Sequence, residues 1–437
     1  MRRGGSLLLA LLMGMAGVEG GMSQAAGPRE AQVFTIDALV ERALRENPEL
    51  QAARAEVEAA QGRLLQAGLR PNPMLDVGFQ KSVTGPDNNV MAGVTVPLDL
   101  NRRRAGRLGV AERELALKEA QVTERERMLR AEVRLRAGEL LAARRNFGIT
   151  EELLAANRQA LRLVRERVHR GGAPSLDEHL MRVEVNRLDA TREVLAGQVE
   201  VLRLQLGTLL GLEPDALLSV RGELHLAPSK LSREEGLRQA LTTRPDLLAA
   251  RAEVEMAGAK VRKEEAEGRW DASVNVGYMR QDFGYGLSGL TERGELRPIT
   301  DVFHYVGGGV TVTLLVRNRN QGNIAAALAE AEAGGRRLEA ATLLVRQEVA
   351  AAFTQQEAAE RALSTYTHGV WEVARQNLAV VRKAYELGRH PLLDVIAEQR
   401  RYIEVEMGYT DVLKRAYDAG VALERTLGVV PIKMRKG

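Results

Sequence analysis

The chain has 437 residues, a formal net charge of +4 and no cysteine. Without cysteine it contains no disulfide framework, no thiol nucleophile and no cysteine metal site. Acidic and basic residues are interspersed, which excludes the clustered basic footprint of a nucleic-acid-binding protein. Aromatic residues make up only 4% of the chain, and this composition favours an elongated body of long helices over one compact core.

The N-terminus has the pattern of a secretory signal peptide. Arg2 and Arg3 precede an apolar run, and small residues before Ala26 provide a cleavage site. We therefore expect residues 1–25 to be removed on export; a disordered basic N-terminus is the alternative. After this leader, no apolar stretch reaches the roughly 20 residues that a membrane helix requires.

The mature sequence repeats itself. Residues Ala52–Glu58 and Ala249–Glu255 are identical, and two further blocks recur in the same order: a G-V-T-V segment at Gly93 and Gly309, and G-x-x-P-x-L-D at 171–177 and 388–394. Ordered blocks at nearly constant spacing indicate a tandem duplication. We expect one repeat at 26–231 and a second at 232–437.

Each repeat contains two segments in which apolar residues alternate with polar residues or glycine. They are predicted as strands at about 74–82 and 89–98, and again at about 271–282 and 302–315. One face of each strand is apolar, as the wall of a membrane barrel requires, although a half-buried soluble hairpin has the same pattern. The Gly-rich and charged segment 284–300 is predicted to be a loop.

A very long helix follows the strands in each repeat. No proline interrupts residues 101–170, and apolar residues recur every seven positions, which is typical of a coiled coil about 100 Å long. Gly171 and Gly388 are predicted to end the two long helices, and Pro174 and Pro391 to begin the return helices. The sequence thus predicts long coiled-coil helical hairpins with tips near 171–177 and 388–394.

These features together resemble the TolC family of outer membrane efflux proteins. The resemblance rests on the duplicated block at Pro48 and Pro245, the segments 94–106 and 310–322, and the two tip motifs; it covers about 35–428. The residues around 317–322 are similar to those of the subgroup that serves heavy-metal exporters of the resistance-nodulation-division type. Four strands cannot close a barrel, so several chains must combine.

The resemblance implies a mainly α-helical protein with membrane β-structure, in which three chains form a 12-stranded β-barrel continued by a 12-helix periplasmic α-barrel. Such a homotrimer lies in the outer membrane of a Gram-negative bacterium and passively conducts substrate, which the subgroup resemblance implies is heavy-metal cations. An inner-membrane resistance-nodulation-division pump and a periplasmic adaptor (membrane fusion) protein would be its partners. It would need no cofactor and bind no nucleic acid.

The resemblance also implies which residues meet the adaptor. Those at the two tips are Arg170, Gly171, Pro174, Leu176, Asp177, Gly388, Arg389, Pro391, Leu393 and Asp394. Some family members carry acidic residues inside the tunnel before the second tip; this chain has Arg382 and Lys383 there instead. These two residues are candidates for a basic tunnel constriction, and a solvated outer face is the alternative.

Catalysis has no support in the sequence. The six histidines are scattered, and no zinc-protease spacing, nucleophile elbow or phosphate loop is present. We therefore expect no enzymatic activity, no catalytic residues and no bound metal. Two alternatives remain: a drug-efflux or protein-secretion duct of the same fold, and a periplasmic coiled-coil structural protein. An adaptor protein is less compatible, because it would lack the four strands and the duplication.

Overall fold

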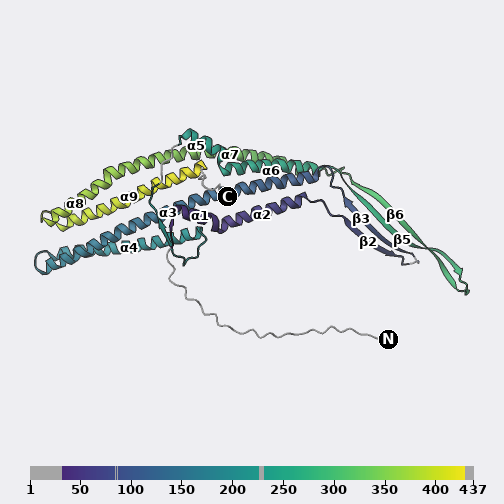
Figure 1. The fold of residues 1–437 in the computed structure, drawn as a ribbon, viewed down its shortest axis with the longest axis horizontal. Coiled ribbons are helices and arrows are strands. Elements are labelled where there is room, and N and C mark those ends of the chain that lie inside the picture. Colours follow the sequence, from purple (N-terminus) through teal and green to yellow (C-terminus); the bar gives the residue numbers. More distant parts are fainter. Residues whose placement is uncertain (1–31, 84, 86, 226–230, 429–437) are drawn as a thin grey trace, which may run out of the picture.

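The computed structural model describes residues 32–83, 85, 87–225 and 231–428. The predicted signal peptide, 1–25, lies outside these residues. The molecule is elongated, with a body of long helices at one end and a narrow sheet at the other (Figure 1). This arrangement confirms the predicted fold class, in which mainly helical hairpins are combined with four strands.

The sheet contains the four predicted strands in the order β2-β3-β5-β6, all antiparallel. Its strands are β2 (Met74–Lys81), β3 (Asn88–Pro97), β5 (Asp271–Leu290) and β6 (Leu296–Thr313). The first repeat supplies one hairpin and the second repeat the other, and β3 pairs with β5 across the duplication. In the single chain, β2 and β6 are both free edges.

Residues paired across the sheet share one face, so the register decides what each face presents. Leu75 pairs with Val94, and Val94 pairs with Val276. The next row on the same side contains Val77, Ala92, Tyr278 and Val306. The rows between them present polar atoms or bare backbone: Asp76, Gly93, Gly277 and Gly307. The sheet therefore has one apolar face and one polar face.

The prediction of a loop over 284–300 is wrong for most of its length. β5 runs to Leu290 and β6 begins at Leu296, with Ser288 paired to Pro298. The register shifts between Gly284 and Ser288, where Gly286 has a φ of +66°. Glycine here permits a bulge through which the hairpin continues, so it does not end the strand.

The first repeat builds a helical hairpin of unequal arms. Helix α3 (Arg103–His169) has 67 residues, and α4 (Ser175–Leu209) runs back along its C-terminal half. Helix α2 (Pro48–Gly68) covers the rest of α3. The side chain of Asn47 donates a hydrogen bond to the carbonyl of Leu209 at 3.0 Å, so α4 ends where α2 begins. The two short helices are stacked end to end.

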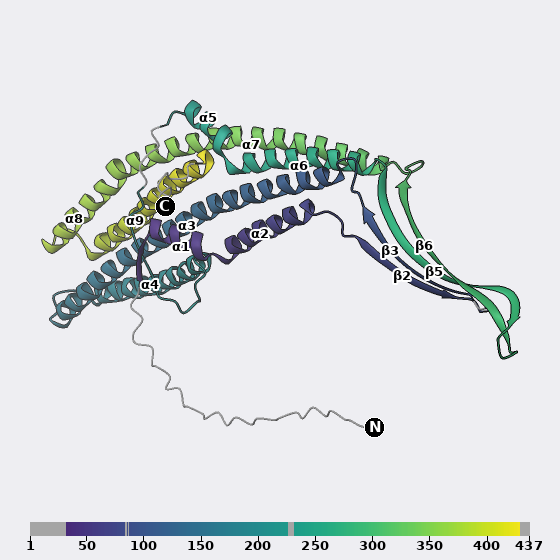
Figure 2. The ribbon, with the colours of Figure 1, turned by 45° about the vertical axis from the view of Figure 1, so that its right-hand side comes forward.

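The second repeat follows the same plan with α6 (Pro245–Glu267), α7 (Gln321–Tyr366), α8 (Glu372–Glu386) and α9 (Leu392–Leu427). Its long helix contains a π-helical segment, η1 (Thr367–Trp371), which the sequence pattern did not indicate. The helices nearest the sheet lie side by side in the order α2, α3, α6 and α7 (Figure 2). Among the described helices, none is both long enough and apolar enough to cross a membrane.

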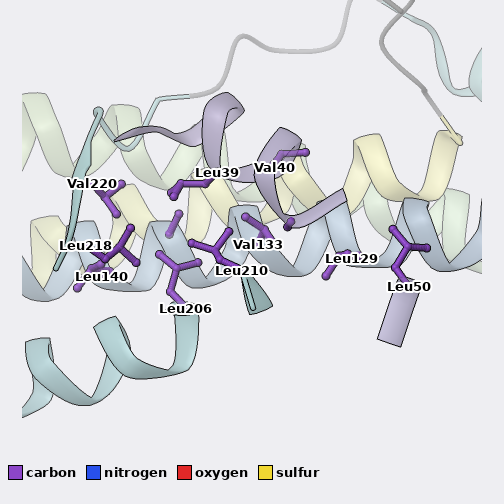
Figure 3. Packing of buried hydrophobic residues seen from close by; sticks show 12 residues of the cluster. Leu39, Val40, Leu50, Leu129, Val133, Leu140, Leu206, Leu210, Leu218 and Val220 are labelled. Atoms are coloured by element: carbon purple, nitrogen blue, oxygen red, sulfur yellow. The ribbon is translucent and has the colours of Figure 1, made fainter. Parts of the chain in front are cut away.

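A small extra layer covers the middle of α3. It contains α1 (Ile36–Glu46) and a parallel pair of short strands, β1 (Gln32–Thr35) and β4 (Leu218–Arg221), while α5 (Arg233–Thr243) packs against α7. The β1–β4 pair was not predicted, because its strands lie far apart in the sequence, with Gln32 paired to Leu218. Figure 3 shows the core beneath this layer, in which Leu39, Val133, Leu140 and Leu206 are completely buried.

The division of the chain at residue 232 stays a proposal. Ser232 is the N-cap of α5 and forms a complete capping box with Glu235. Pro48 and Pro245 occupy the first turns of α2 and α6, where a missing N–H leaves no bond unmade. Equivalent helix starts therefore occur in both repeats.

Candidate functional site

The first hairpin tip is a short turn built by backbone hydrogen bonds. Gly171 adopts a φ of +71°, and the N–H of Gly172 donates to the carbonyl of Arg167 at 2.8 Å. This pattern ends α3 with a left-handed residue, a conformation that glycine adopts without a steric penalty. Pro174 then occupies the N-cap of α4.

The second tip has the same geometry. Gly388 has a φ of +70°, the N–H of Arg389 donates to the carbonyl of Ala384 at 2.8 Å, and Pro391 is the N-cap of α9. Both tips project from the end of the molecule opposite the sheet (Figure 1). The duplication therefore presents two matching protrusions at one end.

Exposed apolar and charged side chains surround both turns. Leu176 is 61% exposed and Leu393 is 57% exposed, although each begins a helix whose later turns are packed. The side chain of Arg170 is 82% exposed and lies 3.6 Å from Glu166. Asp394 is 2.9 Å from the Nδ1 atom of His390. All ten residues predicted to meet an adaptor thus lie at these tips, and the contact itself stays a prediction.

The two basic residues proposed for a constriction lie on α8, shortly before the second tip. Lys383 is exposed and forms an ion pair with Glu386 on its own helix, at 2.9 Å. Arg382 is partly buried and has no ion-pair partner among the described residues. Because Lys383 is already neutralised, Arg382 is the stronger candidate of the two. Their role stays a prediction.

A buried carboxylate that the sequence analysis missed joins three helical segments above the tips. Glu406 on α9 accepts hydrogen bonds from Trp371 Nε1 at 2.7 Å, from Tyr402 Oη at 2.6 Å and from Arg145 Nη2 at 3.1 Å. Arg145 belongs to α3 and also lies over the ring of Tyr409. Glu406 therefore ties the second hairpin to the long helix of the first repeat.

The π-helical segment positions one member of this network. Trp371 is its last residue, and its ring stacks on Tyr409 with centroids 5.2 Å apart. A π turn inserts one extra residue per turn and rotates the side chains that follow it. In this chain the rotation brings the indole N–H to Glu406, so the interruption of the long helix has a specific consequence for packing.

Burial and hydrogen bonding also act on a tyrosine of this network. They raise the pKa of Tyr402 to about 12, burial having the larger effect and the hydrogen bond to Glu406 the smaller.

A signal for Glu406 and the other buried polar residues of α9 was present in the sequence. Gln399, Glu406 and Thr410 fall at the alternating three- and four-residue spacing of the α9 seam, where polar residues are unusual.

Within the described ranges, no group of three or more His, Cys, Asp or Glu side chains is arranged to hold a metal ion.

Comparison with known proteins agrees with this architecture. The model of the family described as outer membrane efflux protein matches residues 39–212 and 236–429, one segment in each repeat. The chain belongs to this family. The resemblance to TolC-like channels is thereby confirmed, and the protein is an outer-membrane efflux protein.

A curated relative supports the same assignment over nearly the full length. The cobalt-zinc-cadmium resistance protein CzcC of Cupriavidus metallidurans is 25% identical over 402 residues, which cover 92% of each chain.

Solved structures share the fold. A membrane protein from Pseudomonas aeruginosa has a TM-score of 0.74 at 20% identity, covering 90% of this chain and 92% of that one. The open-state MtrE outer membrane channel of Neisseria gonorrhoeae has a TM-score of 0.69 at 19% identity, covering 90% and 88%.

Proposed function

We propose that three copies of this chain form the exit duct of a tripartite efflux system. The observation that carries this proposal is the open sheet: the outer edges of β2 and β6 have no partner strand among the described residues, and every residue of β6 is exposed. Unpaired strand edges are not tolerated in lipid. Pairing β6 of one chain with β2 of the next would close a barrel of 12 strands, with its apolar face toward lipid.

The helical part continues the same enclosure through the periplasm. The helices α2, α3, α6 and α7 form a curved layer, and α1, β1 and β4 pack on one side of it. Three such layers would surround a water-filled tunnel. The tips would then meet a periplasmic adaptor, and an inner-membrane pump of the resistance-nodulation-division type would supply the energy. The duct itself conducts passively and has no enzymatic role.

We propose divalent heavy-metal cations as the substrate. The support is the relative CzcC, which is named for cobalt, zinc and cadmium resistance and whose alignment covers 92% of this chain. Drug efflux and protein secretion are the alternatives within the same fold. The described helices supply no feature that favours either alternative.

A deletion strain tests the substrate. Loss of the gene is expected to sensitise cells to zinc, cobalt and cadmium, and plasmid-borne wild-type protein is expected to restore growth. Sensitivity to drugs alone would overturn the metal assignment. As a specificity control, an unrelated outer-membrane porin expressed from the same plasmid should not restore metal resistance.

Membrane fractionation tests the assembly. The protein is expected in the outer-membrane fraction as a trimer that needs detergent for extraction and dissociates only on heating. A freely soluble particle would instead support the periplasmic coiled-coil structural protein and would remove the duct proposal.

A further inference from the structure

The junction between the sheet and the helices contains a pocket lined by arginines. Arg102 precedes α3, Arg262 lies near the end of α6, and Arg269 follows that helix. Together with Glu265 they line a pocket of about 300 Å³. We call these three residues the arginine pocket.

Its three guanidinium groups have no ion-pair or side-chain hydrogen-bond partner among the described residues, and all three side chains are exposed. Most neighbouring carboxylates are already engaged by other cations. Arg103 binds Glu267 at 3.0 Å, and Arg107 binds Asp99 at 2.7 Å. A third pair, Lys263 with Glu264, is 2.8 Å apart. Glu265, which also lines the pocket, has no ion pair among the described residues, so three guanidinium groups face one unpaired carboxylate and the pocket keeps a net positive charge.

The pocket lies on a defined side of the helical layer. Gly109 of α3, which lines the pocket, is separated from Ala137 and Arg144 of the same helix by multiples of seven residues, so all three lie on the same broad face of α3. Ala137 belongs to the core beneath α1, and Arg144 donates to the carbonyl of Val220 in β4 at 3.0 Å. The pocket is therefore on the side covered by the extra layer. In a helical tube this side must face outward, because the extra layer would obstruct the lumen.

The pocket also lies at a defined height. Arg269 is followed directly by Trp270, which is 49% exposed, and then by β5. Leu98, at the end of β3, is 40% exposed. Tryptophan at the end of a membrane strand is typical of the headgroup region, where its ring is partly in lipid and partly in water. The arginine pocket therefore lies just beyond the helix-side end of the sheet's apolar face, at the level of the periplasmic leaflet.

We propose that the arginine pocket binds the phosphate of an anionic phospholipid of the periplasmic leaflet. Guanidinium groups without protein partners suit phosphate oxygens, because each presents a planar fork of donors. Basic residues at this height attract anionic headgroups, and three chains would place such a site at three points around the barrel. The inference rests on the proposed outer-membrane duct, since a soluble protein would never meet this leaflet.

The test uses the full-length protein purified in detergent. Phosphatidylglycerol or phosphatidylcholine is titrated in, and bound lipid is measured by native mass spectrometry. Wild-type protein is expected to bind phosphatidylglycerol about tenfold more tightly than phosphatidylcholine, and less so as salt is raised. The variant Arg102→Gln/Arg262→Gln/Arg269→Gln is expected to lose this preference.

A matched control carries the same change of charge elsewhere. Arg162, Arg346 and Arg361 are exposed on α3 and α7 and have no ion-pair partner among the described side chains. Their triple change to Gln should leave the preference intact. Equal loss in this control would show a general charge effect and overturn the site. Competition by inorganic phosphate at the same concentration as the lipid would overturn the lipid assignment.

The result separates this inference from the proposed function. A heat-modifiable trimer from the outer membrane that binds both lipids equally would overturn the proposed lipid binding at the arginine pocket and leave the duct proposal intact. Protein that forms no membrane-embedded trimer would overturn both. A changed ion selectivity in planar bilayers, with unchanged lipid preference in the triple variant, would place the arginines in the lumen and overturn the inference.

Discussion

The guanidinium of Arg400 on α9 donates two hydrogen bonds to one oxygen of Glu184 on α4, at 2.9 and 2.8 Å. Glu184 is completely buried and also binds Arg187 on its own helix at 2.6 Å. Burial by itself would raise the pKa of this carboxyl, but the hydrogen bonds from Arg187 and Arg400 outweigh it, so the pKa is lowered. This contact links the hairpins of the two repeats near their tips.

Glu184→Gln should loosen that link. The neutral amide keeps the shape but loses the charge-assisted bonds, at a cost of about 2 kcal/mol. Both arginines retain solvent exposure, so their charges are not left buried. Hydrogen exchange of the α4 and α9 amides should become faster by about 10-fold or more. Glu193→Gln, on an exposed position of α4, is the control. Unchanged exchange in the first variant would show that the pair contributes nothing to local stability.

The tips offer a prediction about the adaptor. Leu176→Asp and Leu393→Asp should each reduce metal resistance by about 10-fold, because a central apolar contact at an interface would be replaced by a charge. Val194→Asp makes the same kind of change on an exposed part of α4 farther from the tip and should be tolerated. Trimer content is measured in parallel. Full resistance in both leucine variants would remove these residues from the docking surface.

A close approach between α3 and α9 depends on one glycine. A Cβ atom at Gly138 would lie 2.7 Å from Cε1 of Tyr417, whose ring is buried. Gly138→Ala should therefore lower stability by about 1–3 kcal/mol through overpacking. Gly148→Ala, on the same helix with open space around it, should raise stability by about 0.5–1 kcal/mol. Thermal denaturation of the trimer measures both, and equal midpoints would contradict the predicted clash.

Alkaline titration tests the burial of Tyr402. Its pKa is raised from 10.0 to about 12, so the folded state favours the neutral phenol. The stability that this group contributes is complete below pH 10 and is lost as the pH rises through about 12. The tyrosinate absorbance should show a late component near pH 12 that becomes smaller in Tyr402→Phe. An identical titration curve for the variant would show that Tyr402 ionises with the exposed tyrosines.

The sequence by itself determined the local elements and their order. Alternation marked the four strands, because side chains on a strand point to opposite faces in turn. Heptad spacing marked the long helices. Gly and Pro marked both tips, because glycine frees the backbone and proline restricts it wherever they occur. The duplicated blocks indicated that the second half would repeat the first. All of these signals act over a few residues or over one regular period.

Only the tertiary structure decided what those elements bring together. The pairing of β1 with β4, the partners of Glu406 and the contact of Glu184 with Arg400 join residues that are far apart in the chain. The π turn before Trp371 and the continued hairpin beyond Gly284 also depend on neighbours that supply hydrogen bonds and stacking. Packing selects these partners from many compatible ones, since a buried polar group must find a partner wherever the fold places one.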